Sequence, residues 1–281
     1  MKNLFSNIIT GAYNRIKKST HRPYSDFNIS WLKEKYLKHS TAKNITTHTY
    51  QDKYTISYSD RSAFLLSVRE LFIEEIYQFK TNHPAPYIID CGSHIGMSLL
   101  YFSIHYKNAR IRGFEPDPFN YELARQNVQQ CGLTNAEVVN AAIWINNDKV
   151  QFVSSGDMAS AIDQSAAQGS DQSGQIQAVR LRDLLNEKVD LLKMDIEGAE
   201  YEVLMDCGDK LVNVENLFIE YHGDFNEMHK LNGILDLLVK NNFAYYIKEA
   251  GNIYPKPFWD HEKKEYLFDV QLNIFCFKVK A

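Results

Sequence analysis

From residue 87 onward the chain alternates between short apolar runs and stretches in which apolar residues recur at helical spacing. A strand, a helix and a second strand in this order form a βαβ unit, whose two strands run parallel. The strand candidates lie at about 87–91, 110–114, 137–142, 189–194 and 216–221, and the helix candidates at about 96–107, 118–131 and 198–207. This alternation predicts an α/β fold built on a mostly parallel sheet.

The end of the chain departs from this alternation. "FAYYIKE" (243–249) and "FDVQLNIFCFKVK" (268–280) are strand candidates joined by a long connection without a clear helix. Parallel strands need a crossover connection, usually a helix, whereas antiparallel strands do not. We therefore expect these two segments to form an antiparallel pair.

The first 80 residues follow a different pattern. "THTYQ" and "YTISYS" are period-two stretches joined by Asp52 and Lys53, which predicts a hairpin. The apolar residues of "RSAFLLSVRELFIEEIYQF" (61–79) recur at helical spacing until Pro84 and Pro86 end the pattern. We expect residues 1–80 to form a basic arm, a hairpin and a helix that pack on a core domain of residues 81–281.

Charge is distributed unevenly along the chain. Residues 1–50 contain nine Lys or Arg and two acidic residues, whereas the whole chain has a net charge of −4. Apolar residues between Leu4 and Ile16 fall on one face of a helix in this basic arm. Such a face binds a membrane surface or a partner, or it packs on its own protein, which is the commoner use. Residues 1–38 are thus a candidate for peripheral contact with a membrane or a protein, and the acidic body argues against a nucleic-acid partner.

The composition is that of a soluble globular protein, with 44% hydrophobic and 23% charged residues and no apolar run long enough to span a bilayer. The four cysteines are widely spaced without a CxxC pair, and no cleavable signal is apparent. We expect reduced thiols and a cytoplasmic location.

Residues 154–175 contain only Met158 and Ile162 outside the set Ser, Gly, Asp, Ala and Gln. A segment of this composition buries little surface, which predicts a mobile loop. A lid over an active site and a tolerated surface insertion remain equal alternatives.

Candidate ligand-binding residues follow the first two strands of the alternating region. "YIID" ends in Asp90, the next stretch "CGSHIG" contains Gly92 and Gly96, and "IRGFEPD" places Glu115 after the second strand. Ligands of open α/β sheets bind outside the carboxyl ends of the strands, where an acidic side chain accepts the hydroxyls of a ribose. These residues indicate a nucleoside-binding crevice.

A dinucleotide site is the natural competitor. It requires GxGxxG, but Asp90 and Ile95 stand where the first and third glycines belong when Gly92 is aligned with the second. Asp90 suits a ligand with a positive centre, such as the ammonium and sulfonium groups of S-adenosylmethionine. A glycine turn required only for steric reasons is the other alternative.

A second cluster of polar residues follows two later strands. "LLKMDIEGAEYEVL" (191–204) places Asp195, Glu197 and Glu200 after one strand, and "FIEYHGD" places Glu220, His222 and Asp224 at the end of the next. Because parallel strands end at the same edge of the sheet, we expect this cluster to open on the edge that contains Asp90.

Together, "IIDCGSHIGMSLLYF", "GFEPDPFNYELARQN", "LLKMDIEGAEYEVL" and "FIEYHGD" resemble, in this order, the FkbM family of S-adenosylmethionine-dependent methyltransferases, over residues 85–224. The resemblance implies a Rossmann-like class I methyltransferase fold with a seven-stranded sheet. It also implies transfer of a methyl group, usually to a hydroxyl of a sugar or another natural product.

The resemblance also assigns cofactor contacts. Asp90, Gly92 and Gly96 would line the methionine part, Glu115 would bind the ribose, and Asp195 would lie near the reacting methyl. The segment Asn140, Ala141 and Ala142 would flank the adenine, and the adjoining residues Ser93, His94 and Pro116 complete the predicted set. Two departures from the family pattern are His94, where asparagine is frequent, and the lack of an acidic residue at the adenine.

Transfer of a methyl group to a hydroxyl requires removal of the hydroxyl proton. His222 is the first candidate for the general base because the pKa of an unperturbed histidine is about 6.5. Asp195 and Glu197 are the alternatives. The carboxylates Asp195, Glu197, Glu200 and Glu220 with His222 also suit Mg²⁺. Salt bridges and helix capping explain the same residues without a metal, so a metal-free site is favoured.

The sequence thus predicts an O-methyltransferase that uses S-adenosylmethionine and acts on a hydroxyl of a sugar, a glycan or a natural product. The alternative function is a non-catalytic cofactor-binding or scaffolding protein whose basic arm recruits a partner or a membrane. The presence of both clusters argues for the enzyme.

Overall fold

The computed structural model describes residues 25–153, 161–162, 173–251, 253–262 and 267–279. The chain divides into two compact units, Met1–Ile76 and Tyr77–Ala281. The sequence placed this boundary at residue 80, and the packing of the first unit on the second stays a prediction. The amphipathic segment between Leu4 and Ile16 lies outside the described residues, which begin at Ser25, whereas residues 25–38 of the predicted contact region are described.

The first unit contains the predicted hairpin. Strands β1 (Thr46–Tyr50) and β2 (Tyr54–Tyr58) pair antiparallel, with Tyr50 opposite Tyr54 at the turn. Helix α2 (Trp31–His39) precedes the hairpin and α3 (Arg61–Phe72) follows it. The ring of Phe64 on α3 stacks on Tyr58 with 3.9 Å between the ring centroids, so the helix and the hairpin share one aromatic core.

The predicted helix 61–79 is too long. Helix α3 ends at Phe72, and the capping N–H of Ile73 donates to the carbonyl of Arg69. Glu75 then adopts a φ of 49°, in the left-handed region that a right-handed helix cannot accommodate. The backbone turn at Glu75 therefore ends the helix before the prolines.

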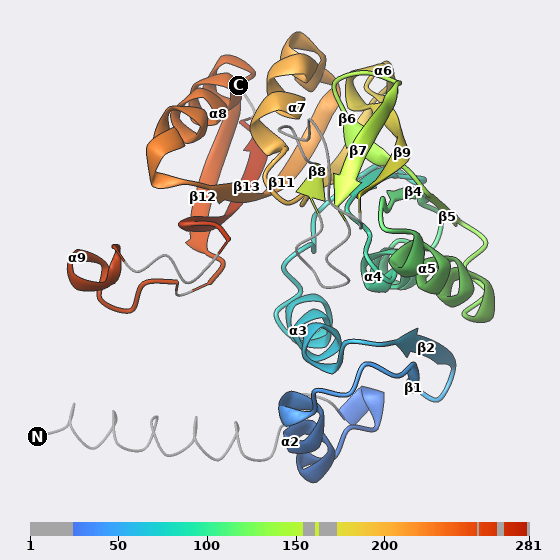
Figure 1. Cartoon of the computed structure of the whole chain (residues 1–281). Coiled ribbons are helices and arrows are strands. Elements are labelled where there is room, and N and C mark those ends of the chain that lie inside the picture. The colour runs from blue at the N-terminus through green and yellow to red at the C-terminus, as the bar shows by residue number, and fades with distance from the viewer. Residues whose placement is uncertain (1–24, 154–160, 163–172, 252, 263–266, 280–281) are drawn as a thin grey trace, which may run out of the picture. The chain divides into compact units, whose positions relative to one another are not determined.

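The second unit is built on a seven-stranded sheet (Figure 1). Its strands are β3 (Tyr87–Cys91), β4 (Arg110–Phe114), β5 (Ala136–Val139), β10 (Val189–Met194), β11 (Val214–Gly223), β12 (Phe243–Glu249) and β13 (Val270–Lys278), in the order β12-β13-β11-β10-β3-β4-β5. Only β13 runs against its neighbours, β11 and β12. This is the Rossmann-like class I methyltransferase arrangement that the sequence predicts, with its final antiparallel pair.

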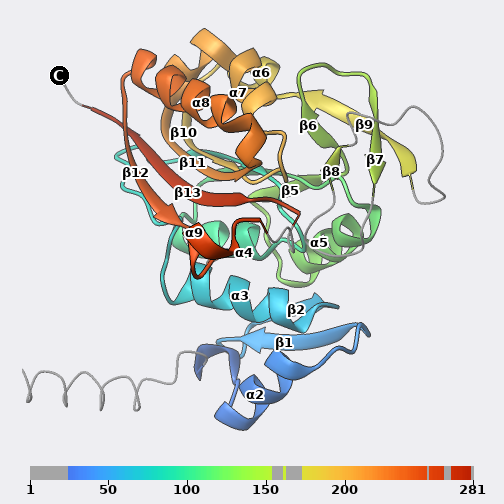
Figure 2. The ribbon, with the colours of Figure 1, turned by 60° about the vertical axis from the view of Figure 1, so that its left-hand side comes forward.

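Helices cover both faces of this sheet. Figures 1 and 2 show α4 (Met97–His105) and α5 (Pro118–Gln130) on one side, and α6 (Leu181–Leu184), α7 (Glu200–Cys207) and α8 (Met228–Lys240) on the other. Leu192 and Leu217 of the sheet pack with Leu204 and Leu238 of α7 and α8 in one buried cluster. The remaining short helices are η1 (Ser25–Phe27), η2 (Gly208–Asn213), η3 (Phe225–Glu227) and α9 (Pro257–Asp260).

The predicted strand 137–142 is two separate strands. β5 ends at Val139, and Ala142 begins β6 (Ala142–Trp144) in a different sheet. The side chain of Asn140 donates to the backbone carbonyls of Glu115 and Pro116, at 2.9 and 3.1 Å, so it fixes the turn between the two strands. The single strand was wrong because this long-range contact redirects the chain.

The second sheet has the order β6-β9-β7-β8. Its other members are β7 (Lys149–Val153), β8 (Ala161–Ile162) and β9 (Ser173–Arg180). The predicted mobile loop 154–175 thus contains β8 and the beginning of β9, and its other residues lie outside the described part of the chain.

All four cysteines are buried and free of disulfide bonds, as the sequence predicts. Among the helices of the described residues, none combines the length and apolar content that crossing a membrane requires.

Candidate functional site

The predicted site residues gather at one edge of the seven-stranded sheet, at the carboxyl ends of β3, β4, β10 and β11. Backbone hydrogen bonds join these ends. The N–H groups of Gly92 and Ser93 donate to the carbonyl of Phe114 at 3.0 and 2.9 Å, and the N–H of Asp195 donates to the carbonyl of Cys91 at 3.0 Å. The cofactor half and the reactive half of the predicted site are therefore adjacent, as expected.

The backbone structure itself requires the two glycines after β3. Gly92 has a φ of 88°, and a Cβ there would lie 1.9 Å from the carbonyl oxygen of Asp195. Gly96 has a φ of 82°, and its Cβ would lie 3.4 Å from Ala124 on α5. The close approach of Gly92 to the Asp195 carbonyl and the positive φ of Gly96 account for these glycines, so the steric alternative explains them without a close approach by a ligand.

Asp90 is fully buried and is already compensated by charge. Its carboxylate forms an ion pair with Lys193 Nζ at 3.1 Å and accepts a hydrogen bond from the Ser98 hydroxyl. Burial alone would lower the pKa of Lys193, but Asp90 and the other nearby acidic groups outweigh burial and raise it well above the usual value. Lys193 therefore already offsets the charge of Asp90, and contact between Asp90 and a cationic ligand stays a prediction.

Two polar groups at this edge remain suited to a bound nucleoside. The hydroxyl of Ser93 is buried and has no hydrogen-bond partner among the described residues. Glu115 is also buried, and its two carboxylate oxygens accept the backbone N–H groups of His94 and Asp117 at 2.7 and 3.0 Å. Burial raises the pKa of Glu115 to about 8, although both hydrogen bonds oppose the shift. Each oxygen retains a lone pair for a ligand hydroxyl.

The residues predicted to flank the adenine differ in how far they are exposed. Ala141 and Ala142 are buried in hydrophobic clusters, so their side chains belong to the core. Asn140 and Pro116 are partly exposed and lie together, since the Asn140 amide donates to the Pro116 carbonyl. Contact with an adenine would thus use Asn140, Pro116 and backbone atoms.

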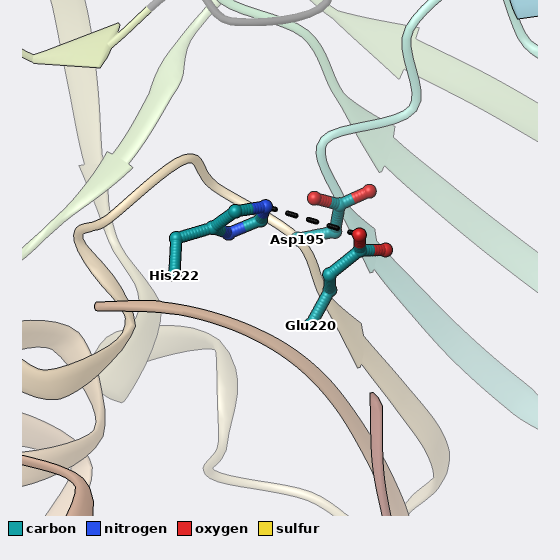
Figure 3. A group of neighbouring side chains, drawn as sticks. All are labelled: Asp195, Glu220 and His222. Carbon is teal, nitrogen blue, oxygen red and sulfur yellow. Dashed lines mark ion pairs between the residues drawn. The ribbon is translucent and has the colours of Figure 1, made fainter. Parts of the chain in front are cut away.

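Figure 3 shows the reactive half of the site, where the His222 imidazole points toward the carboxylates of Asp195 and Glu220. One ligand atom from each of these three side chains lies within 4.8 Å of the other two. Glu197 joins them, with 3.7 Å between its carboxylate and His222 Nε2, and Glu200 lies behind the ring. We call Asp195, Glu197, Glu200, Glu220 and His222 the carboxylate cluster.

His222 is held by Glu200. Nδ1 of the ring lies 3.3 Å from the Glu200 carboxylate, which also accepts the N–H groups of Ile196 and Gly198. Burial lowers the pKa of His222, but the hydrogen bond and the charge of Glu200, with Glu197 and Asp195, outweigh it and raise the pKa to about 10. His222 therefore does not have the ordinary pKa that made it the first candidate for the base.

Glu197 occupies a strained backbone position. Its φ is 54°, in the left-handed region that residues with a side chain seldom adopt. Burial raises the pKa of Glu197 to about 8, against the opposing effect of His222. Strained residues in such a turn are frequent at functional sites. The turn directs Glu197 into the carboxylate cluster.

Two residues of the site were missed by sequence reasoning. Lys193 belongs to the quoted "KMDIEGAE" motif, and a lysine inside an otherwise apolar buried strand was a signal of a buried partner. Tyr77 offered no such signal. Its ring packs edge-on against Phe218 at 4.8 Å, and Lys193 Nζ lies 5.8 Å from the ring centroid.

A surface cavity of about 620 Å³ lies elsewhere, at the amino ends of β3, β4 and β5. Tyr87, Arg110 and Arg112 line it together with acidic residues. It contains none of the predicted site residues. The predicted site residues therefore lie at the carboxyl ends of the strands, and this cavity lies at the opposite edge of the sheet.

Known proteins resemble this chain across the same region. Residues 90–252 match the family described as "Methyltransferase FkbM domain". "Methyltransferase 1" of Beauveria bassiana (strain ARSEF 2860) is 27% identical over 184 residues, which are 56% of this chain and 74% of that protein. "Methyltransferase sdnD" of Sordaria araneosa is 26% identical over 170 residues, 48% of this chain and 66% of that protein.

Among solved structures, the FkbM methyltransferase of Methylobacillus flagellatus KT is similar, with a TM-score of 0.43 and 15% identity. The alignment covers 71% of this chain and 45% of that protein, so the chain spans less than half of its length. The family match covers more than half of the present chain, including both halves of the site. The chain belongs to the FkbM family of methyltransferases.

Proposed function

We propose that this protein transfers the methyl group of S-adenosylmethionine to a hydroxyl of a small acceptor, such as a sugar, a glycan or another natural product. The observation that carries the proposal is the junction of the two halves of the site. The loop after β3, beside Glu115, is hydrogen-bonded to the strand end that bears Asp195. A cofactor held by the first half would present its reactive centre to the second. Membership of a methyltransferase family supports the same reaction.

The cofactor would be held mainly by Ser93 and Glu115. The unpartnered Ser93 hydroxyl and the free lone pairs of the Glu115 carboxylate are buried polar groups that a nucleoside would satisfy. The cofactor supplies a methyl carbon bonded to a positively charged sulfur. Asp90 contributes indirectly, since it fixes Lys193, whose ammonium donates to the Gly92 carbonyl at 2.8 Å.

In the reaction, the acceptor oxygen forms a bond to the methyl carbon, the carbon–sulfur bond breaks, and the hydroxyl proton passes to the protein. The group that takes this proton must touch the acceptor. The side chains of Asp195 and Glu197 are 27% and 19% exposed, whereas that of His222 is 2% exposed. Accessibility therefore favours Asp195 and Glu197 as the base over His222, the first candidate from the sequence.

Titration calorimetry with S-adenosylhomocysteine tests the cofactor half. We expect Glu115→Ala to weaken binding strongly, because the variant loses the carboxylate that faces the nucleoside crevice. Glu137→Ala, which alters an exposed side chain on β5, is the matched control and should bind like the wild type. Equal affinity of Glu115→Ala and wild type would refute the assignment of Glu115.

The transfer itself is tested by release of S-adenosylhomocysteine across a panel of glycans and small hydroxylated compounds. Turnover with at least one acceptor, reduced in Asp195→Asn, supports the proposal. Binding of the cofactor without release on any acceptor would favour the alternative function, a non-catalytic cofactor-binding or scaffolding protein.

A further inference from the structure

We propose that Asp195, Glu220 and His222 bind a divalent metal ion of the Mn²⁺ class. One ligand atom from each residue already lies within 4.8 Å of the others, and the three side chains converge on one point (Figure 3). The role of this metal in catalysis rests on the proposed function, but its binding does not.

The orientation of His222 supports a metal site. A metal-bound histidine usually donates its second ring N–H to a carboxylate or carbonyl, which fixes the tautomer and the ring. Glu200 has this position, with 3.3 Å between its carboxylate and His222 Nδ1. Glu200 is itself fixed by the N–H groups of Ile196 and Gly198. Nε2 faces the carboxylates of Glu197, at 3.7 Å, and Glu220, at 3.8 Å, and can bind a cation.

An independent observation comes from the neighbouring strand. Asn273 on β13 lies directly opposite Glu220 in the antiparallel pair, so the two side chains project from the same face of the sheet. Asn273 is 5% exposed, and its amide oxygen has no hydrogen-bond partner among the described residues. A buried amide oxygen without a partner is costly unless a ligand satisfies it. It is also a good ligand for a hard cation.

The charged groups of the carboxylate cluster also support a metal site. Among the ion pairs of the described residues, four carboxyl groups of the cluster share two cationic side chains, His222 and Lys193, and Lys193 also pairs with Asp90. These acidic groups would attract a divalent cation. The sequence favoured a metal-free site because salt bridges and helix capping explain the same residues without a metal.

The ligand set indicates the class of metal. Carboxylate and amide oxygens suit Mg²⁺, Ca²⁺ and Mn²⁺, whereas imidazole nitrogen suits transition metals, so a mixed set favours Mn²⁺. In the proposed reaction such an ion would bind the acceptor hydroxyl and make its proton more acidic. The proton would then pass to Glu197, which lies 3.7 Å from His222 but is not one of the three ligands.

The test is direct titration of the EDTA-treated, dialysed full chain with Mn²⁺, followed by loss of the free-ion signal in electron paramagnetic resonance. We expect one site per chain in the wild type. Glu220→Gln, which keeps the shape of the side chain, should weaken Mn²⁺ binding by more than about 100-fold, and Glu200→Gln by about 10 to 100-fold. Glu227→Gln, which alters an acidic residue paired with Lys230, is the matched control and should bind like the wild type.

No Mn²⁺ binding by the wild type would overturn the metal site, as would equal binding by Glu220→Gln. If Glu220→Gln does not fold, Asp195→Asn takes its place with the same expected loss. Titration with S-adenosylhomocysteine in EDTA runs in parallel. Cofactor binding and turnover without Mn²⁺ binding would refute the metal alone, whereas Mn²⁺ binding without cofactor binding would refute the proposed function alone.

Discussion

The two halves of the site differ in the burial and the pairing of their carboxyl groups. On the cofactor side, at the ends of β3 and β4, Asp90 and Glu115 are buried, and each is matched by a partner, Lys193 for Asp90 and two backbone N–H groups for Glu115. On the acceptor side, at the ends of β10 and β11, Asp195 and Glu220 are about one quarter exposed and crowd around His222. The first half is a preformed cradle, and the second is a partly exposed group of carboxylates around one histidine.

This difference indicates that one half recognises the cofactor and the other acts on the acceptor. Buried, hydrogen-bonded carboxylates keep one geometry, as recognition of a constant cofactor requires. Partly exposed carboxylates can bind a cation or accept a proton, as chemistry on an acceptor requires. Substitutions on the cofactor side should therefore affect folding and cofactor binding first, and those on the acceptor side should affect metal binding and turnover.

The largest effect should come from Lys193→Met. The variant leaves Asp90 buried without its partner, and breaking a buried ion pair costs about 3–5 kcal/mol. Urea unfolding would measure this loss. Lys188→Met is the control, since Lys188 pairs with Glu215 on the surface at 3.4 Å and such pairs contribute below about 1 kcal/mol. Equal losses in the two variants would contradict the view that Lys193 compensates Asp90.

Gly92→Ala should have the next largest effect. The added Cβ meets the Asp195 carbonyl, and alanine is strained at a φ of 88°, so we expect a loss of about 3 kcal/mol in unfolding free energy. Gly132→Ala separates the two causes. Gly132 has a φ of 65° with nothing near its Cβ position, so its replacement should cost only about 1–2 kcal/mol. Similar costs would show that Gly92 is required for its φ alone.

The third prediction concerns pH. Because burial raises the pKa of Glu115 to about 8 from 4.5, the folded protein holds an extra proton between these values, and this contribution to stability is lost as pH rises through 8. Ribose hydroxyls donate to the ionised carboxylate, so affinity for S-adenosylhomocysteine should instead rise about tenfold between pH 7 and pH 9. Calorimetry across this range should find a flat profile in Glu115→Gln. The same slope in both proteins would assign the titration to another group.

The sheet was predictable from sequence because short, mostly apolar runs alternate along the chain with stretches of helical periodicity. The order of these runs was enough to place the strand ends, and therefore Asp90, Glu115, Asp195 and His222, at one edge of the sheet. Two element boundaries were not predictable from these runs. The end of α3 depends on the backbone at Glu75, and the break after β5 depends on the contact of Asn140 with the segment after β4.

The chemistry within the site was less predictable than its position. Residue types alone suggested that Asp90 binds a cation of the ligand and that His222 has an ordinary pKa. In the folded chain Asp90 pairs with Lys193 and His222 pairs with Glu200, so both interpretations changed. Pairing of charged groups depends on distances of a few ångströms, which a sequence pattern does not contain.

The smallest expected effect tests how the cradle is built. Asp117 accepts the N–H groups of Phe119 and Asn120 at the start of α5, and its own N–H donates to Glu115. Asp117→Ala should cost about 1 kcal/mol of unfolding free energy through loss of this N-cap, and Asp117→Asn should cost less because the amide oxygen still accepts. Affinity for S-adenosylhomocysteine should fall far less than in Glu115→Ala, since the backbone N–H remains. A loss of affinity as large as that of Glu115→Ala would mean that the cradle depends on the cap itself.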